Sequence, residues 1–398
     1  MKKTIAILMM LSAVALLSAR VHDRYVETGF SAGVSGSNSY FGLGDIFTDT
    51  IVIDLNQIAS DLGDNGLAFN LGVGLSNFTN LNFGPKFKLG FFLNAEGFAS
   101  SSIPKSFFEL AAEGNSLNKT YTGDLNIIGD AFVEAGAYFG TRIAFLDVKF
   151  QPALFMPFFH IEDPTASYSF RTNSDGTLYA DVQASIPIYS VVPLDGESDI
   201  VAGEAISNLV ASSGLDFSGG ASWDLFPRFL TVGARVKHLP LIPARLENRT
   251  LMTASYTVDM SDLINNMGSG DMFNTTESSD YVSDKKQVYI LRPFKLGVNA
   301  VFMPLRNEFI SLEPNLDLGV YKSVYVDAGI KVKFDLFNIL ALTASSNYED
   351  MIWKEQLGLM LNLRVLEVDF LVGSQSDDFV KSFAGAGLGA SLGMKFGF

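Results

Sequence analysis

The 398-residue sequence contains no cysteine, which excludes disulfide bonds, thiol chemistry and a lipid anchor attached to cysteine. Its three histidines, His22, His160 and His238, are far apart, and none has a second histidine three or four residues away. Metal sites commonly place their ligands at such short spacings. The sequence therefore gives no reason to expect a metal, a cofactor or an enzyme.

Basic residues are also scarce. The chain carries 28 lysines and arginines against 43 aspartates and glutamates, so its net charge at pH 7 is −15. Proteins that bind nucleic acid neutralise phosphates with lysine and arginine. We therefore expect no nucleic-acid partner.

Long apolar runs are missing after residue 17, so no transmembrane helix is predicted there. The N-terminus differs from the rest, because Lys2 and Lys3 precede an apolar run over residues 5–17, which the small residues Ser18 and Ala19 follow. This is the order of regions in a secretory signal peptide. We expect cleavage of residues 1–19 after export from the cytoplasm.

Hydrophobic residues nevertheless make up 48% of the chain, and many of them alternate with polar residues. In residues 324–336, VYVDAGIKVKFDL, the apolar positions alternate with a set that includes Asp327, Lys331 and Lys333. The same period appears at 87–97, 133–142, 230–239 and 357–364. A period of two predicts strands with one apolar and one polar face.

Two architectures contain such strands, namely a soluble sandwich and a membrane barrel. Sandwich strands average about five to six residues, whereas membrane strands have about 9–11. The longest runs here match the membrane class, and a sheet in lipid must close on itself to satisfy its edge hydrogen bonds. We therefore predict an all-β fold, a closed antiparallel transmembrane β-barrel of about 14 strands, within a range of about 12–16, because such barrels have even strand numbers.

Candidate strands lie near 85–99, 119–142, 146–158, 164–186, 213–239, 246–258 and 283–303, with five more after them. Tight turns are predicted near 145–146, 225–227, 304–306, 336–338 and 365–366. Longer polar connections such as 345–350 and 374–382 alternate with these turns. Short turns at one end and long loops at the other are typical of outer-membrane barrels.

The last residues, GAGLGASLGMKFGF at 385–398, have an apolar residue at every even position. The odd positions are glycine except for Ser391 and Lys395. We interpret this segment as the closing strand, paired with the first. Its glycine face has two explanations, close approach of a plug inside the barrel or relief of curvature in the wall.

Four segments do not alternate. We assign 20–64 as an N-terminal segment with the first strand and a candidate hatch or plug, and 65–398 as the barrel. Helical insertions are predicted near 104–115, 197–214 and 257–280. These insertions are either surface loops with a helical turn or parts that fold into the lumen or cap it.

Charged residues on the polar faces are candidates for lining the lumen, where they either tune selectivity or simply supply a polar wall. They are Glu96, Glu134, Arg142, Lys149, Arg235, Lys237, Lys331 and Lys333.

The signal peptide, the acidic barrel pattern and the terminal MKFGF resemble Gram-negative or spirochaetal outer-membrane barrels. The resemblance implies an outer-membrane location and recognition by the barrel-assembly machinery through Leu392, Met394, Phe396 and Phe398. The layout also resembles FadL-type long-chain fatty-acid transporters and related barrels. That resemblance implies 14 strands, an N-terminal hatch and helical outer loops, but the chain lacks the Asn-Pro-Ala motif that many members have near the N-terminus.

The first functional hypothesis is passive uptake of small hydrophobic solutes such as long-chain fatty acids. The second is a general porin for small hydrophilic solutes, and the third is a structural or adhesive surface barrel. The expected partners are outer-membrane lipid, the assembly machinery and a hydrophobic solute.

Overall fold

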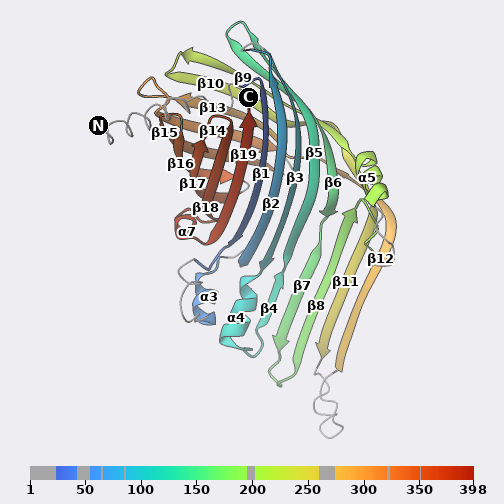
Figure 1. The fold of residues 1–398 in the computed structure, drawn as a ribbon. Coiled ribbons are helices and arrows are strands. Elements are labelled where there is room, and N and C mark those ends of the chain that lie inside the picture. Colours follow the sequence, from blue (N-terminus) through green and yellow to red (C-terminus); the bar gives the residue numbers. More distant parts are fainter. Residues whose placement is uncertain are drawn as a thin grey trace, which may run out of the picture.

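The computed structural model describes residues 24–42, 54–63, 66–84, 87–194, 202–259, 274–320, 323–349 and 351–398. Most of these residues lie in antiparallel strands that form a barrel with a second sheet attached to one end (Figure 1). In the described ranges, no helix has the length and apolar character needed to cross a membrane.

Fourteen of the described strands pair in a closed antiparallel circle, which confirms the predicted fold class. In order around the barrel they are β1 (Val26–Asn38), β2 (Leu67–Asn82), β3 (Phe87–Ile103), β5 (Asn126–Ile143), β6 (Leu146–Ile161), β9 (Gly214–Phe226), β10 (Leu230–Ile242), β13 (Phe294–Phe302), β14 (Ile310–Val320), β15 (Val324–Leu336), β16 (Leu340–Glu349), β17 (Ile352–Asn362), β18 (Leu366–Ser376) and β19 (Gly387–Gly397).

The circle closes between the first and last of these strands. β1 and β19 pair from Glu27–Gly397 to Ser37–Gly387, and the Phe398 N–H donates to the Val26 carbonyl at 3.1 Å. A Cβ atom at Gly387 would lie 2.3 Å from the Ser37 Cβ, so this glycine permits a close approach between neighbouring strands. The C-terminus is therefore held by strand pairing.

The exposed fractions of the side chains along β15 distinguish the outer face of the barrel wall from the inner face. The apolar residues Val324 and Val326 are 66% and 47% exposed, whereas Asp327 and Asp335 are only 3% and 5% exposed. A soluble protein has the opposite arrangement, with apolar side chains buried and carboxylates in water. The outer surface is therefore suited to lipid and the interior is polar.

The connections differ between the two ends. Short turns join β5 to β6, β9 to β10, β15 to β16 and β17 to β18, at the end where the C-terminus lies (Figure 1). In the β15–β16 turn, Phe337 and Asn338 have left-handed φ angles of 59° and 58°, and the Asn338 N–H donates to the Asp335 carboxylate. The four helices of the described residues and the second sheet lie in the connections of the opposite end, which we call the loop end.

The helices are α3 (Leu55–Asp61), α4 (Lys105–Glu113), α5 (Ala202–Ala211) and α7 (Phe379–Phe383). Ile58 of α3 and Phe108 of α4 share one buried apolar cluster, so these two helices pack together. Within the predicted hatch segment 20–64, residues 26–38 form wall strand β1 and residues 55–61 form α3. A hatch in the rest of that segment stays a prediction. The helical insertion predicted near 257–280 falls mostly outside the described residues, which resume at residue 274.

Five of the strands that the structure describes lie outside the barrel and form a second sheet in the order β4–β7–β8–β11–β12 (Figure 1). They are β4 (Thr120–Asp124), β7 (Thr165–Thr172), β8 (Leu178–Ser190), β11 (Ala244–Asp259) and β12 (Asn274–Ile290). The prediction that segments 164–186 and 246–258 belong to the barrel wall was therefore wrong. β6 pairs with β9 up to Phe155 and then with β8 from Phe159, and this change of partner directs the second sheet away from the barrel.

Candidate functional site

Arg292, in the connection between β12 and β13, lies at the centre of a buried polar cluster. Its Nη1 donates to Glu134 of β5 at 2.8 Å and to Asp216 of β9 at 3.1 Å, and its Nη2 lies 3.1 Å from Nε2 of His238. The guanidinium also lies over the rings of Phe132 and Phe155, at 5.4 and 5.3 Å from their centroids. One side chain thus joins the loop end to three wall strands.

His238 reaches this cluster because β10 has a bulge. The pairing register of β10 with β9 shifts between Val236 and Leu239, and His238 has a left-handed φ of 53°. A bulge turns consecutive side chains toward the same side of a strand. Lys237 and His238 accordingly both line the interior hollow described below, and the His238 N–H donates to Ser218 Oγ at 2.9 Å.

The hydrogen bond from Arg292 determines which ring nitrogen of His238 carries the proton. Arg292 can only donate, so Nε2 of His238 must accept and the ring proton must lie on Nδ1. That Nδ1 lies 3.6 Å from Asp216 Oδ2 and has no hydrogen-bond partner in the described residues, and the same holds for Asp216 Oδ1. Glu134, Asp216 and His238 have the residue types and proximity of a metal site. Arg292 already contacts all three, so it supplies one cation that the two carboxylates share.

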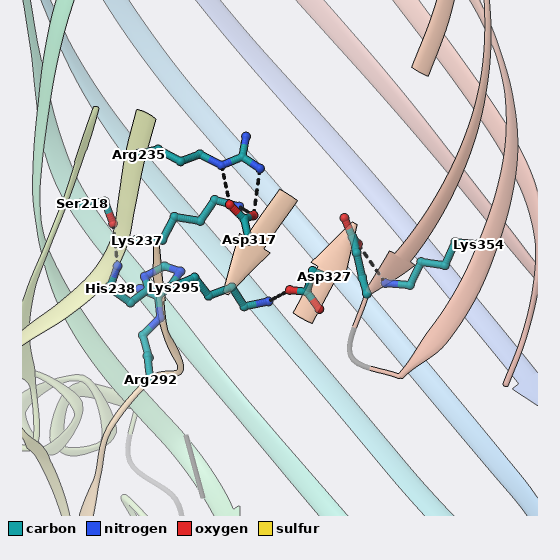
Figure 2. Close-up of polar contacts among 10 residues, drawn as sticks. Ser218, Arg235, Lys237, His238, Arg292, Lys295, Asp317, Asp327 and Lys354 are labelled. Carbon is teal, nitrogen blue, oxygen red and sulfur yellow. Dashed lines mark hydrogen bonds and ion pairs between the residues drawn. The ribbon is translucent and has the colours of Figure 1, made fainter. Parts of the chain in front are cut away.

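Further ion pairs lie along the interior wall next to this cluster (Figure 2). Arg235 of β10 donates two hydrogen bonds to Asp317 of β14, both at 2.8 Å, and Lys237 lies 3.2 Å from the same carboxylate. Lys295 of β13 donates to Asp327 of β15 at 2.6 Å. The interior charges on this side are therefore paired between nearby strands.

A hollow of about 510 Å³ lies beside the Arg292 cluster, within the range of about 300–1,000 Å³ that is usual for small-molecule sites. Its lining combines aromatic rings, amides and cations from six wall strands. The residues are Ser76, Phe78, Asn80, Phe91, Phe92, Asn94, Glu134, Tyr138, Lys149, Gln151, Ser218, Lys237 and His238. Such a lining suits a solute with both an apolar body and a polar group.

The loop end carries exposed apolar side chains on its short helices. Phe107 of α4, Ile206 and Val210 of α5, and Phe379 and Phe383 of α7 are all exposed. The opposite face of α5 packs, through Ala205 and Leu209, against an apolar cluster of Phe155, Tyr189, Val191, Val192, Ala244, Leu246, Val288 and Ile290. The ring of Phe155 also contacts Arg292, so this cluster adjoins the polar one.

The predicted lumen residues take different positions. Glu134 joins Arg292, while Lys149 and Lys237 line the hollow. Glu96 on β3 pairs with Phe132 on β5, next to the cluster. The remaining four form ion pairs elsewhere, Arg142 with Asp147, Arg235 with Asp317, Lys331 with Glu313 and Lys333 with Asp335.

The four residues predicted as an assembly signal lie at the end of β19. Leu392, Met394 and Phe396 alternate along the exposed face of the strand, and Phe398 is 75% exposed just beyond it. Their recognition by assembly machinery stays a prediction.

Sequence reasoning missed Arg292 and Asp216 and treated His238 as an isolated histidine. Arg292 lies in a short break between two alternating runs, and no spacing rule links it to Glu134, which is 158 residues away. One feature of the sequence could have pointed to Arg292, namely that it is an arginine between Leu291 and Pro293 in an apolar stretch.

Solved structures that resemble this chain include a FadL homologue and two toluene transporters. A FadL homologue of Pseudomonas aeruginosa has 10% identity and a TM-score of 0.46, with 94% of this chain and 91% of that chain covered. The Ralstonia pickettii toluene transporter TbuX has 10% identity and a TM-score of 0.43, covering 94% and 90%. The Pseudomonas putida toluene transporter TodX has 11% identity and a TM-score of 0.42, covering 97% and 93%.

No protein-family model matches the sequence, and no curated protein matches it. At the identities and TM-scores above, the likeness assigns no function to this chain.

Proposed function

We propose that this barrel lies in an outer membrane and carries small hydrophobic solutes with a polar end, such as long-chain fatty acids, inward by passive transport. The observation that carries the proposal is the composition of the interior hollow. The rings of Phe78, Phe92 and Tyr138 provide apolar contact for a hydrocarbon chain, and the ammonium group of Lys149 provides attraction for a carboxylate.

The loop end supports the same solute class. Phe107 of α4, Ile206 of α5 and Phe383 of α7 are exposed at the loop end. They offer apolar surface to a solute that arrives from outside.

The outer-membrane location rests on the exposed apolar belt of the wall and on the signal-peptide pattern. The alternating residues Leu392, Met394 and Phe396, with Phe398 at the terminus, fit a signal for the barrel-assembly machinery.

Oleate binding by protein reconstituted in liposomes tests the proposal. We expect saturable binding, at least tenfold weaker in Lys149→Glu because the substituted carboxylate repels the ligand. Lys331→Glu is the matched control, since Lys331 lies on β15 and does not line the hollow. Equal affinity in all three proteins would contradict the assigned site.

A general porin is the second candidate, because amide and hydroxyl groups of Ser76, Asn80, Asn94 and Gln151 share the lining of the hollow. Liposome swelling in sucrose separates the two. We expect no swelling beyond that of protein-free liposomes. Rapid swelling without oleate binding would establish the porin instead.

A further inference from the structure

The second sheet, outside the barrel, has one face made only of polar side chains over three successive rows. In the middle row the residues opposite one another on β4, β7, β8, β11 and β12 are Asp124, Ser167, Gln183, Ser255 and Ser278. Directly paired residues of an antiparallel sheet project to the same side. This row therefore crosses the whole sheet without an apolar residue.

The rows on either side have the same character. One consists of Thr122, Ser169, Asp181, Thr257 and Thr276, and the other of Thr165, Ser185, Thr253 and Asp280. Ten of these fourteen side chains are Ser or Thr, and none is Lys or Arg. An ordinary solvated surface mixes charges of both signs and contains lysine. We call these three rows the polar face.

The reverse side of the same strands is apolar in its central positions, such as Tyr168, Val182 and Tyr256 in one row. Serine and threonine are thus concentrated on one side of the sheet, and on the reverse side they include Thr275 and Ser279 of β12. Every residue of the polar face keeps solvent exposure, and α4 contacts the reverse side, where Phe107 lies 6.0 Å from the ring of Tyr168.

A hollow of about 390 Å³ lies on the polar face, large enough for a small-molecule group. Its polar lining includes Ser167, Gln183, Ser185, Thr253 and Ser255. The neighbouring Asp181 is held in place, because Thr257 Oγ1 donates to it at 2.9 Å and Gln183 Nε2 at 3.0 Å. Exposed Tyr179 occupies the same side, two residues from Asp181.

We propose that the polar face binds a neutral polysaccharide. Hydroxyl and amide groups both donate and accept hydrogen bonds, as sugar hydroxyls do, and carboxylates accept from pairs of them. An exposed tyrosine ring can stack on the apolar side of a sugar. Asp124, Asp181 and Asp280 give the face a negative charge, which disfavours phosphorylated or sulfated glycans. Rigid strands present these groups without an ordering cost.

This binding is separate from solute transport and does not depend on it. Binding of the full-length protein in detergent to immobilised dextran, amylose, galactomannan and chitohexaose tests the proposal, with dextran sulfate as the anionic comparison. We expect saturable binding to at least one neutral glycan. Gln183→Ala should weaken it at least fivefold, and Ser255→Phe should abolish it by filling the hollow.

Val182→Ala and Val182→Phe are the matched controls, because Val182 is exposed on the reverse side of β8. Both should bind as the unchanged protein does. Failure of the unchanged protein to bind any of the four neutral glycans, stronger binding to dextran sulfate, or equal losses in the variants of the two sides would overturn the proposal. Oleate binding, measured in parallel, should be the same in all variants.

Discussion

At the scale of single residues, Arg292 contacts two carboxylates, a histidine and two aromatic rings in the interior. Its guanidinium pairs with both Glu134 and Asp216, accepts no hydrogen bond itself and orients His238. Removing one partner from a buried charge cluster leaves the others uncompensated, at a cost of about 3–5 kcal/mol. Arg292 is therefore both a tether for the β12–β13 connection and the counter-charge of the interior carboxylates.

Arg292→Ala should accordingly lower the stability of the folded barrel and make its interior more attractive to cations. We expect a larger and more cation-selective single-channel conductance in planar bilayers. Arg306→Ala is the control, because Arg306 lies in an exposed turn over the ring of Phe229. Identical conductance and selectivity in Arg292→Ala and the unchanged protein would show that the cluster does not narrow the interior.

Asp284, on the second sheet, gives a pH-dependent prediction. Arg249 donates hydrogen bonds to both of its carboxylate oxygens, and these bonds lower the pKa of Asp284 below its ordinary value of 3.8. A lowered pKa means that the pair stabilises the fold above pH 3.8, and that this stabilisation is lost as the pH falls through the pKa of the folded state.

Asp284→Asn should therefore lower the urea midpoint slightly at pH 7 and by a smaller amount near pH 3. The effect is small because the carboxylate is exposed. Asp280→Asn on the same strand serves as control. A difference of equal size at both pH values would refute the role of this ion pair.

At the scale of elements, the closing strand β19 was predictable in detail. Its alternation between Ala386 and Phe398 is a local property of the sequence, and lipid on one side and a polar interior on the other select that pattern directly. The second sheet was not predictable in the same way. β7, β8 and β11 alternate as wall strands do, and only the change of partner along β6 separates them from the barrel.

Phe398→Asp should sharply reduce the amount of folded barrel in the membrane, because a charge replaces an exposed aromatic ring beside the closing strand. Phe337→Asp is the matched control, since Phe337 is equally exposed but lies in a turn between β15 and β16. The measurement is the membrane fraction that migrates differently before and after boiling on a detergent gel. Normal levels of Phe398→Asp would contradict the assembly role.

At the scale of the whole molecule, the barrel has an apolar exterior and a polar interior. Its loop end carries two kinds of surface. One is the set of helices with exposed apolar residues, and the other is the sheet with its polar face. The barrel followed from composition and period, whereas the interior cluster depends on contacts between distant segments such as Arg292 and Glu134. No local pattern encodes such contacts, which is why the fold could be predicted and the site only in part.

Uptake of radiolabelled oleate is the most direct test of the proposed function. The protein would be produced in a Gram-negative strain that lacks its own fatty-acid uptake barrel, with heat-modifiable migration as proof of folding. We predict uptake well above the empty-vector level, and a clear reduction with Lys149→Glu but not with Lys331→Glu. Uptake equal to the empty vector, with folded protein present in the outer membrane, would contradict the account.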